Sequence, residues 1–255
     1  MPDALRAARC QRLAAPLTTF VLNLDHDRDR LARAKRLLED LPGLVMRRIP
    51  GVMAADLPQA ARAMLRGTPE APGNAATLGV FLGHMAIWEA VAQTGDWALV
   101  VEDDFLMTDS AWLWGLDLPL DAELVFANTA GDPFRGEAPL AAPSVLPLTA
   151  LWARFRSPDL ERAQPGAFGY LLHAEGARKL LAAVMRDGCR AHVDWRMLFY
   201  GLPVGALGDL TGHWLESRHR NQGVLTQAVV RGYCISPGQV SHGGFASTRL
   251  RQERG

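Results

Sequence analysis

The sequence predicts an α/β protein whose covered, mostly parallel sheet is flanked by helices. Short apolar and β-branched runs alternate with segments of helical periodicity, the order typical of such folds. The expected strands are apolar on both faces, as strands of a covered sheet are. With 49% hydrophobic and 21% charged residues in 255, the chain has the composition of a globular protein and the length for one sizeable domain.

The chain is expected to open with a strand, a helix and a second strand. Residues 17–24, LTTFVLNL, form a β-rich run. Leucines recur at helical spacing over 27–41, with Asp27 or Asp29 as candidate caps, and a Pro-Gly pair follows. Residues 44–52, LVMRRIPGV, supply the second strand.

A buried helix and an acidic strand are expected next. Residues 53–74 contain scattered Pro, Gly and Ala and predict a helical excursion with a loop. Residues 77–95 are small or apolar nearly all round, which indicates a buried helix. The strand 97–105, WALVVEDDF, follows at once and ends in three acids.

The second half has weaker signals. Residues 122–129 predict a strand, and 131–165 are rich in Pro and Ala, which favours a functional loop or lid. A strand over 168–172 and a helix ending near 187 follow, and the segment around His242 is expected to be an ordered loop. Residues 1–16 are expected to form a flexible arm, and 17–255 a single domain.

Composition excludes several classes of function. The net charge is zero, which argues against a nucleic-acid partner. The three cysteines have no paired or zinc-ligand spacing, so we expect a reducing compartment. No apolar run reaches the roughly 18–20 residues of a spanning helix, and the N-terminal segment has no apolar core of a signal peptide. We therefore expect a cytoplasmic protein with at most peripheral membrane association.

The triplet Glu102, Asp103 and Asp104 is the leading candidate site. Open α/β sheets bind ligands at the carboxyl ends of their strands. Three adjacent acids repel one another, so a cation should share the site, and Mg²⁺ or Mn²⁺ suits carboxylate ligands. The alternative is a solvated acidic loop.

Four segments resemble a known family when they are taken in order. The opening strand ends in an N-L-D pattern with a later arginine, a buried helix carries glycine, histidine and tryptophan, and a strand then ends in E-D-D. The fourth segment is GAFGYLLHAEGARKLL, residues 166–181. The matching residues of the first three are Asn23, Leu24, Asp25, Arg30, Gly79, His84, Trp88, Glu102, Asp103 and Asp104. Over roughly residues 18 to 245 the chain resembles glycosyltransferase family 25, which includes bacterial lipopolysaccharide and collagen galactosyltransferases.

Two features depart from that family. Gly83 stands where the family usually has serine, which puts a hydroxyl contact there in doubt. Residues 131–165 do not align, and acceptor recognition is expected there, so the identity of the acceptor is the least transferable inference.

The resemblance implies a fold and a reaction. The fold is the GT-A type, a single Rossmann-like domain around a mixed sheet. The activity is metal-dependent transfer of a hexose from a nucleotide sugar, with UDP-galactose the leading donor, to a hydroxyl of a glycan, lipid-linked or protein acceptor. The resemblance also implies inversion at the anomeric carbon, Mn²⁺ with Mg²⁺ as the alternative, and a role in lipopolysaccharide biosynthesis. If the acceptor is lipid-linked, the cytoplasmic protein is expected at the cytoplasmic face of the inner membrane.

The resemblance also implies roles for the acids. Asp104 is expected to bind the metal directly, and Glu102 directly or through water. Asp103 is expected to contact the ribose or the donor sugar. A third ligand in GT-A enzymes often comes from a C-terminal histidine, for which His242 is the first candidate, with His213 and His219 behind it.

The remaining candidates each have a structural alternative. Residues expected to bind the nucleotide sugar are Asn23, Leu24, Asp25, Arg30, Gly79, His84 and Asp103. Asn and Asp at a strand end also serve turns and caps, and a histidine on an apolar helix is usually a core residue. An inverting transfer needs a base. The candidate base is Asp194, which lies in the apolar sequence HVDW, and Glu216 and Asp209 are its rivals. The structural alternative for Asp194 is a helix cap.

Two other functions remain open. A catalytically silent relative would bind carbohydrate or assemble a complex without turnover. A metal-dependent nucleotidyltransferase would share the acids at the strand end and release pyrophosphate.

Overall fold

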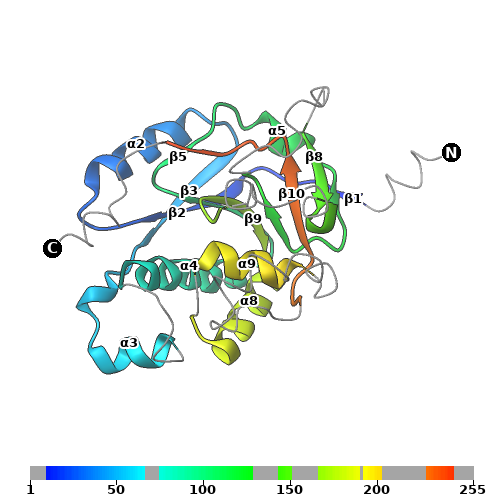
Figure 1. Cartoon of the computed structure of the whole chain (residues 1–255). Coiled ribbons are helices and arrows are strands. Elements are labelled where there is room, and N and C mark those ends of the chain that lie inside the picture. Colours follow the sequence, from blue (N-terminus) through cyan, green and yellow to red (C-terminus); the bar gives the residue numbers. More distant parts are fainter. Residues whose placement is uncertain are drawn as a thin grey trace, which may run out of the picture.

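A seven-stranded mixed sheet organises the molecule (Figure 1). The computed structural model describes residues 10–66, 75–128, 143–150, 166–189, 192–202 and 228–243. The sheet has the order β3-β2-β4-β9-β7-β10-β8. Its strands are β3 (Leu44–Pro50), β2 (Leu17–Asn23), β4 (Trp97–Glu102), β9 (Gly169–His173), β7 (Leu124–Phe126), β10 (Gly232–Ser236) and β8 (Ser144–Pro147).

Five of these strands run in one direction. β3, β2 and β4 pair in parallel, β9 is antiparallel to both of its neighbours, β7 and β10 pair in parallel, and β8 returns antiparallel to β10. The prediction of an α/β fold on a mixed, mostly parallel sheet is therefore confirmed.

Helices cover both faces of the sheet (Figure 1). One face carries α4 (Ala75–Thr94), α8 (Ala174–Asp187) and α9 (Val193–Gly201), and the other carries α2 (Arg28–Glu39) and α5 (Ala111–Gly115). The 3₁₀ turn η1 (Ala54–Asp56) and α3 (Gln59–Arg66) connect β3 to α4. Two small ribbons complete the fold, β1 (Cys10–Gln11) with β6 (Leu118–Pro119) and β5 (Phe105–Leu106) with β11 (Ser241–His242).

The apolar strand β4 divides the core into two layers. Ala98 and Val100 pack with the residues of α4, α8 and α9, whereas Leu99 and Val101 pack with those of α2 and α5. A strand buried on both faces needs apolar residues at successive positions, which is the pattern in the sequence. Helix α4 packs against the sheet and against α8, which explains why it is apolar nearly all round.

The expected helices and strands of the first half are confirmed. β2, α2, β3, α4 and β4 lie where the sequence places them, and η1 with α3 forms the expected helical excursion. β7, β9 and α8 are confirmed in the second half.

Two expectations need correction, and one strand was missed. The arm is not loose from Cys10 onward, because β1 pairs with β6 and Leu13 is buried, while residues 1–9 lie outside the described residues. The predicted loop 131–165 contains strand β8. Strand β10, which separates β7 from β8, was not predicted from the sequence at all.

Within the described residues, no helix is both long and apolar enough to cross a membrane.

Candidate functional site

The site begins where two neighbouring parallel strands end. Leu22 of β2 pairs with Glu102 of β4, so the residues that follow them meet at one edge of the sheet. The backbone N–H of Asp103 donates to the Leu22 carbonyl at 3.1 Å. The side-chain amide of Asn23 donates to Asp103 Oδ2 at 2.7 Å. The order of the strands thus joins two motifs that are about 80 residues apart in the sequence.

Arg30, on the first turns of α2, supplies positive charge to these acids. Its Nη2 pairs with a carboxylate oxygen of Asp103 and lies 2.7 Å from Asp104 Oδ2. Both carboxylates are buried, with side-chain exposures of 7% and 5%. The expected cation partner of the triplet is therefore, in part, a side chain of the protein itself.

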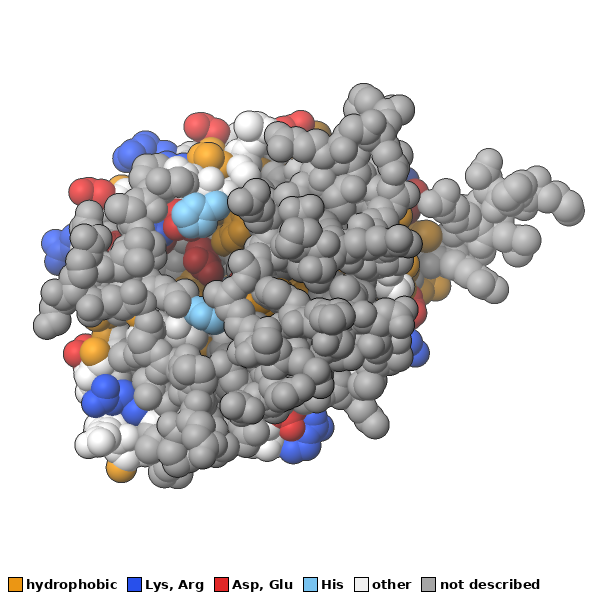
Figure 2. Space-filling view, in the orientation of Figure 1, with side chains coloured by type: hydrophobic (Ala, Val, Ile, Leu, Met, Phe, Trp, Pro, Cys, Tyr) orange, Lys and Arg blue, Asp and Glu red, His pale blue; other side chains and the backbone are white. Residues whose placement is uncertain are grey.

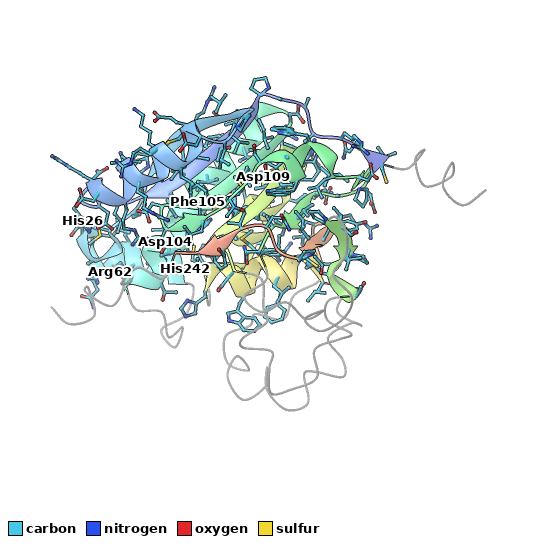
Figure 3. The ribbon with its side chains drawn as sticks, turned by 90° about the horizontal axis from the view of Figure 1, so that it is seen from above. His26, Arg62, Asp104, Phe105, Asp109 and His242 are labelled. Atoms are coloured by element: carbon cyan, nitrogen blue, oxygen red, sulfur yellow. The ribbon has the colours of Figure 1, made fainter. Side chains whose placement is uncertain are left out.

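His242 reaches the same carboxylate from the far end of the chain. β11 pairs antiparallel with β5, and the Gly243 N–H donates to the Asp104 carbonyl at 2.7 Å. His242 Nε2 then lies 2.9 Å from Asp104 Oδ2 (Figure 3). The ring of Phe168 meets the histidine edge-on, with centroids 5.8 Å apart. The structure therefore brings together Asp104 and His242, two of the three predicted metal ligands.

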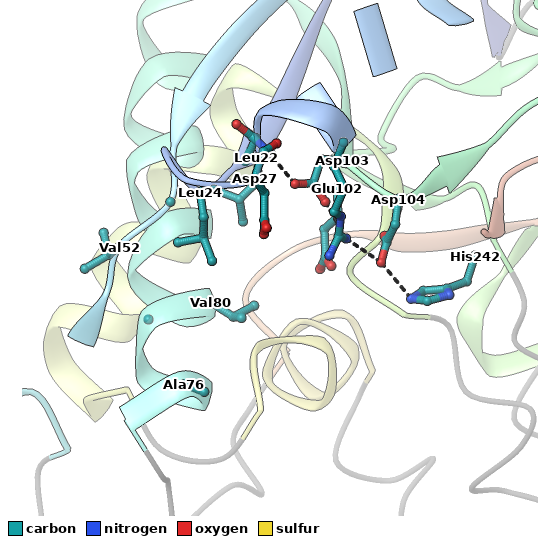
Figure 4. A pocket seen from close by; sticks show the side chains of 14 residues that line it. Leu22, Leu24, Asp27, Val52, Ala76, Val80, Glu102, Asp103, Asp104 and His242 are labelled. Carbon is teal, nitrogen blue, oxygen red and sulfur yellow. Dashed lines mark hydrogen bonds and ion pairs between the residues drawn. The ribbon is translucent and has the colours of Figure 1, made fainter. Parts of the chain in front are cut away.

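A pocket opens beside these residues (Figure 4). One end is acidic, and the other is walled by short apolar residues of the β2 end, the segment after β3, and α4. The lining residues are Leu22, Asn23, Leu24, Asp27, Arg30, Gly51, Val52, Ala76, Gly79, Val80, Glu102, Asp103, Asp104 and His242. In the space-filling view, acidic and histidine side chains gather on this face of the molecule (Figure 2).

Burial and mutual repulsion act on the three acids in different ways. Burial raises the pKa of Asp103 to about 6, although Asn23 and Arg30 oppose the rise. Burial and the charge of Glu102 raise the pKa of Asp104. For Glu102, burial also disfavours the charge, but the hydrogen bond and charge of His84, together with the charges of His242 and Arg30, outweigh it and hold its pKa below the usual value.

His84 supports the site from behind. Its side chain is fully buried and does not line the pocket, and its Nε2 lies 3.3 Å from Glu102 Oε1. Direct contact with a nucleotide sugar, which the sequence predicts, would require the buried ring to move. Gly83 precedes it because a Cβ there would lie 2.7 Å from a methyl group of Leu22. The departure from the family's serine therefore has a packing reason.

Asp25 is not among the residues of the pocket. Its side chain is exposed and pairs with Arg48. Arg48 also donates from Nε to the Asn23 side-chain oxygen at 3.0 Å, which orients the amide toward Asp103. Sequence reasoning missed Arg48, and its place on the strand next to Asn23 is the signal that could have found it.

Asp194 is the second residue of helix α9, whose N-cap is His192, and it lies outside the pocket lining. Its carboxylate accepts the N–H of Trp195 at 2.8 Å. Burial raises its pKa, and the charge of Glu102 raises it further. The rivals His213, His219, Glu216 and Asp209 lie outside the described residues.

The residues present fit a divalent cation with few protein ligands. No group of three or more His, Cys, Asp or Glu side chains arranged to hold a metal occurs in the described ranges. However, Asp104 Oδ1 is buried and has no hydrogen-bond partner in the part of the chain that the structure describes, so it has lone pairs to offer a cation. Neighbouring ligands of an octahedral ion lie about 3 Å apart, and Asp104 Oδ2 and His242 Nε2 are 2.9 Å apart. Mg²⁺-like ions often take one or two carboxylates and complete their shell with substrate phosphates.

Comparisons with known proteins find only weak structural likenesses. No protein-family model and no curated protein sequence matches the chain. The galactosyltransferase LgtC, solved with donor and acceptor sugar analogues, superposes with a TM-score of 0.40 at 15% identity, over 93% of this chain and 94% of that one. The glycosyltransferase GlyE of Streptococcus pneumoniae TIGR4 gives 0.39 at 12% identity, over 94% of this chain and 59% of that one. Mouse xyloside xylosyltransferase 1 gives 0.34 at 14% identity, over 96% and 93%. At these TM-scores, function must be argued from the residues of the site.

Proposed function

We propose that the chain is a metal-dependent glycosyltransferase of the GT-A type, related to family 25. It transfers a hexose from a nucleoside diphosphate donor, with UDP-galactose the first to test, to a hydroxyl of a glycan, lipid-linked or protein acceptor. The single observation that carries the proposal is the divided pocket, in which buried Asp103 and Asp104 meet Arg30 and His242 at one end and small apolar residues line the other.

Each end of the pocket suits one part of such a donor. The apolar wall of Leu24, Val52, Ala76 and Val80 suits a nucleobase and the carbons of a ribose. Gly79 faces the pocket without a side chain, which leaves room for the ligand. The guanidinium of Arg30 suits phosphate oxygens, because it can donate two hydrogen bonds in a plane.

The acids would hold the cation. Asp104 and His242 are the nearest ligands, and Glu102 would bind directly or through water. A bound Mn²⁺ or Mg²⁺ would neutralise the charge that develops on the leaving diphosphate. Asn23 and Arg30 hold Asp103 in place, where its carboxyl can accept a hydrogen bond from a ribose or sugar hydroxyl.

Asp194 would serve as the base. Its raised pKa brings it nearer the operating pH, where a general base works best. It would accept the proton of the acceptor hydroxyl as that oxygen attacks the anomeric carbon, which inverts the configuration there. Asp194→Asn should then lower kcat and leave the affinity for donor unchanged.

The test is product release from a panel of sugar nucleotides, with and without Mn²⁺. The proposal predicts a nucleoside diphosphate from at least one donor, dependent on the metal. Pyrophosphate would instead identify a nucleotidyltransferase. Metal-dependent donor binding without any turnover would identify a silent binding module, and the absence of binding to every donor would refute the proposal.

A further inference from the structure

A chain of buried hydrogen bonds runs from the core to Glu102. The indole nitrogen of Trp88 lies 3.0 Å from the hydroxyl of Tyr170. That hydroxyl lies 2.9 Å from His84 Nδ1, and His84 Nε2 lies 3.3 Å from Glu102 Oε1. Trp88, Tyr170 and His84 are fully buried, whereas Glu102 lines the pocket. This series of hydrogen bonds therefore connects α4 and β9 of the core with the acidic end of β4.

The chemistry of its members sets the direction of the protons. An indole N–H can only donate, so the Tyr170 oxygen accepts from Trp88. Tyr170 has one hydroxyl proton, and its other hydrogen-bond partner among the described residues is His84 Nδ1. If Nδ1 carried the proton, the tyrosine proton would be buried without an acceptor, which is costly. The arrangement that satisfies every group has Nδ1 accepting from Tyr170 and the proton on Nε2, where it donates to Glu102.

We propose that Trp88 and Tyr170 are positioning residues that fix His84 as its Nε2–H tautomer and thereby orient the Glu102 carboxylate in the pocket. Neither residue touches substrate in this account, and each acts through His84. The tautomer follows from the contacts alone, whereas its consequence for activity rests on the proposed glycosyl transfer.

Such a device has a clear use at this position. Glu102 is close to two other acids, and a carboxylate there is prone to rotate. A fixed Nε2–H donor engages one carboxylate oxygen and so holds the carboxylate in one orientation. Partners of this kind, which stand behind a metal ligand, typically change metal affinity or activity by about 10-fold to 100-fold when they are lost.

The tautomer can be measured directly. A ¹⁵N–¹H correlation spectrum of the full chain labelled at histidine nitrogens reports which nitrogen of each ring carries the proton. The signals of His84 are assigned by their loss in His84→Gln. We expect an Nε2–H ring in the wild type. An Nδ1–H ring, or rapid averaging between the two forms, would overturn the proposal whatever the enzyme does.

Two variants and a matched control test the cause. Tyr170→Phe removes the donor to Nδ1, and we expect it to change the His84 signature and to weaken binding of Mn²⁺ with donor by about 10-fold to 100-fold. Tyr200→Phe is the control, because Tyr200 is equally buried and its hydroxyl bonds Asp187 at 2.9 Å, in a different contact. It should leave the His84 signature and the binding unchanged.

The remaining outcomes are also decisive. An unchanged His84 signature in Tyr170→Phe would overturn the proposal. If that variant does not fold, Trp88→Phe takes its place. Without the indole N–H, the Tyr170 oxygen is free to accept a hydrogen bond from His84 Nδ1 as well as to donate one to it, so we expect a mixture of the two His84 tautomers. A signature that changes as expected in a protein that turns over no sugar nucleotide would support the hydrogen-bonded chain and refute the proposed function.

Discussion

Asp104→Asn removes one negative charge from the centre of the site and keeps the shape of the side chain. In the wild type, Asp104 Oδ2 lies 2.7 Å from Arg30 and 2.9 Å from His242, while Oδ1 has no hydrogen-bond partner among the described residues. An amide cannot replace a carboxylate as a strong ligand of a hard cation. We therefore expect the variant to lose the metal while Arg30 stays paired with Asp103.

The size of the loss can be bounded. Losing a residue that only supports a metal ligand lowers metal affinity or activity by about 10-fold to 100-fold. Loss of the ligand itself should lower metal affinity by at least the upper figure. That is a weakening of metal-dependent donor binding by about 100-fold or more, or about 2.7 kcal/mol at about 1.36 kcal/mol for each factor of ten.

Stability should move little in the same variant. The pKa of Asp104 is raised in the folded protein, chiefly by burial. A raised carboxyl pKa means that the folded state is penalised for the charge at neutral pH, and the penalty disappears as the pH falls below the unfolded pKa. The neutral amide should therefore leave the thermal midpoint at pH 7 unchanged or slightly raised.

Isothermal titration with a nucleoside diphosphate and Mn²⁺ measures the binding, and calorimetric unfolding measures the stability. Asp117→Asn is the matched control, because Asp117 is exposed and pairs only with exposed Arg12 in the described structure. It should change neither quantity appreciably. Wild-type affinity in a folded Asp104→Asn protein would refute the assignment of Asp104 as a ligand.

Three further predictions concern packing. Gly83→Ser should lower the free energy of unfolding by about 1–3 kcal/mol, because the added Cβ would lie 2.7 Å from the buried side chain of Leu22. Gly115→Ser is the control and should be tolerated, because nothing lies within 4 Å of its added Cβ. Urea unfolding compares the two variants. Asn128→Ala should cost about 1–3 kcal/mol in the same measurement, since its amide bonds Gly166 and Gly169 carbonyls at 2.6 Å, and an unchanged midpoint would contradict this. Thiol titration of the native protein at pH 8 should find Cys10 reactive and Cys189 and Cys234 inert. Burial raises the pKa of Cys189 to about 11 and that of Cys234 to about 12. Rapid reaction of all three thiols would contradict the fold.

The sequence was sufficient for the elements whose periodicity is strong. The apolar run of β4 and the uniformly apolar α4 could be predicted because a covered strand and a buried helix leave plain patterns. The opening β2-α2-β3 unit could be predicted because its connections are short and local.

Long-range pairing could not be deduced in the same way. The contact between Asp104 and His242 depends on the pairing of β5 with β11, two short strands far apart in the chain, and the resemblance alone suggested this histidine. Strand β10 contains a glycine and a cysteine instead of a β-branched run, so its place between β7 and β8 leaves little local signal in the sequence.

The roles of individual side chains were harder still to predict. His84 was expected to contact the nucleotide sugar, yet it is buried behind Glu102, because the side of α4 on which it lies faces Tyr170 of the sheet. Arg30 was expected near a diphosphate, and in this structure its guanidinium pairs with the acids. Periodicity places a residue on an element, but the partner it meets depends on how the elements pack.

The most direct test of the account is a crystal structure with a nucleoside diphosphate and Mn²⁺, with anomalous scattering used to locate the metal. We expect a manganese peak bound by Asp104 and His242 and in contact with the diphosphate, with the nucleoside against Leu24 and Val80. We also expect Arg30 to contact phosphate oxygens. A nucleotide bound elsewhere, or bound in this pocket without manganese at Asp104, would contradict the central claim.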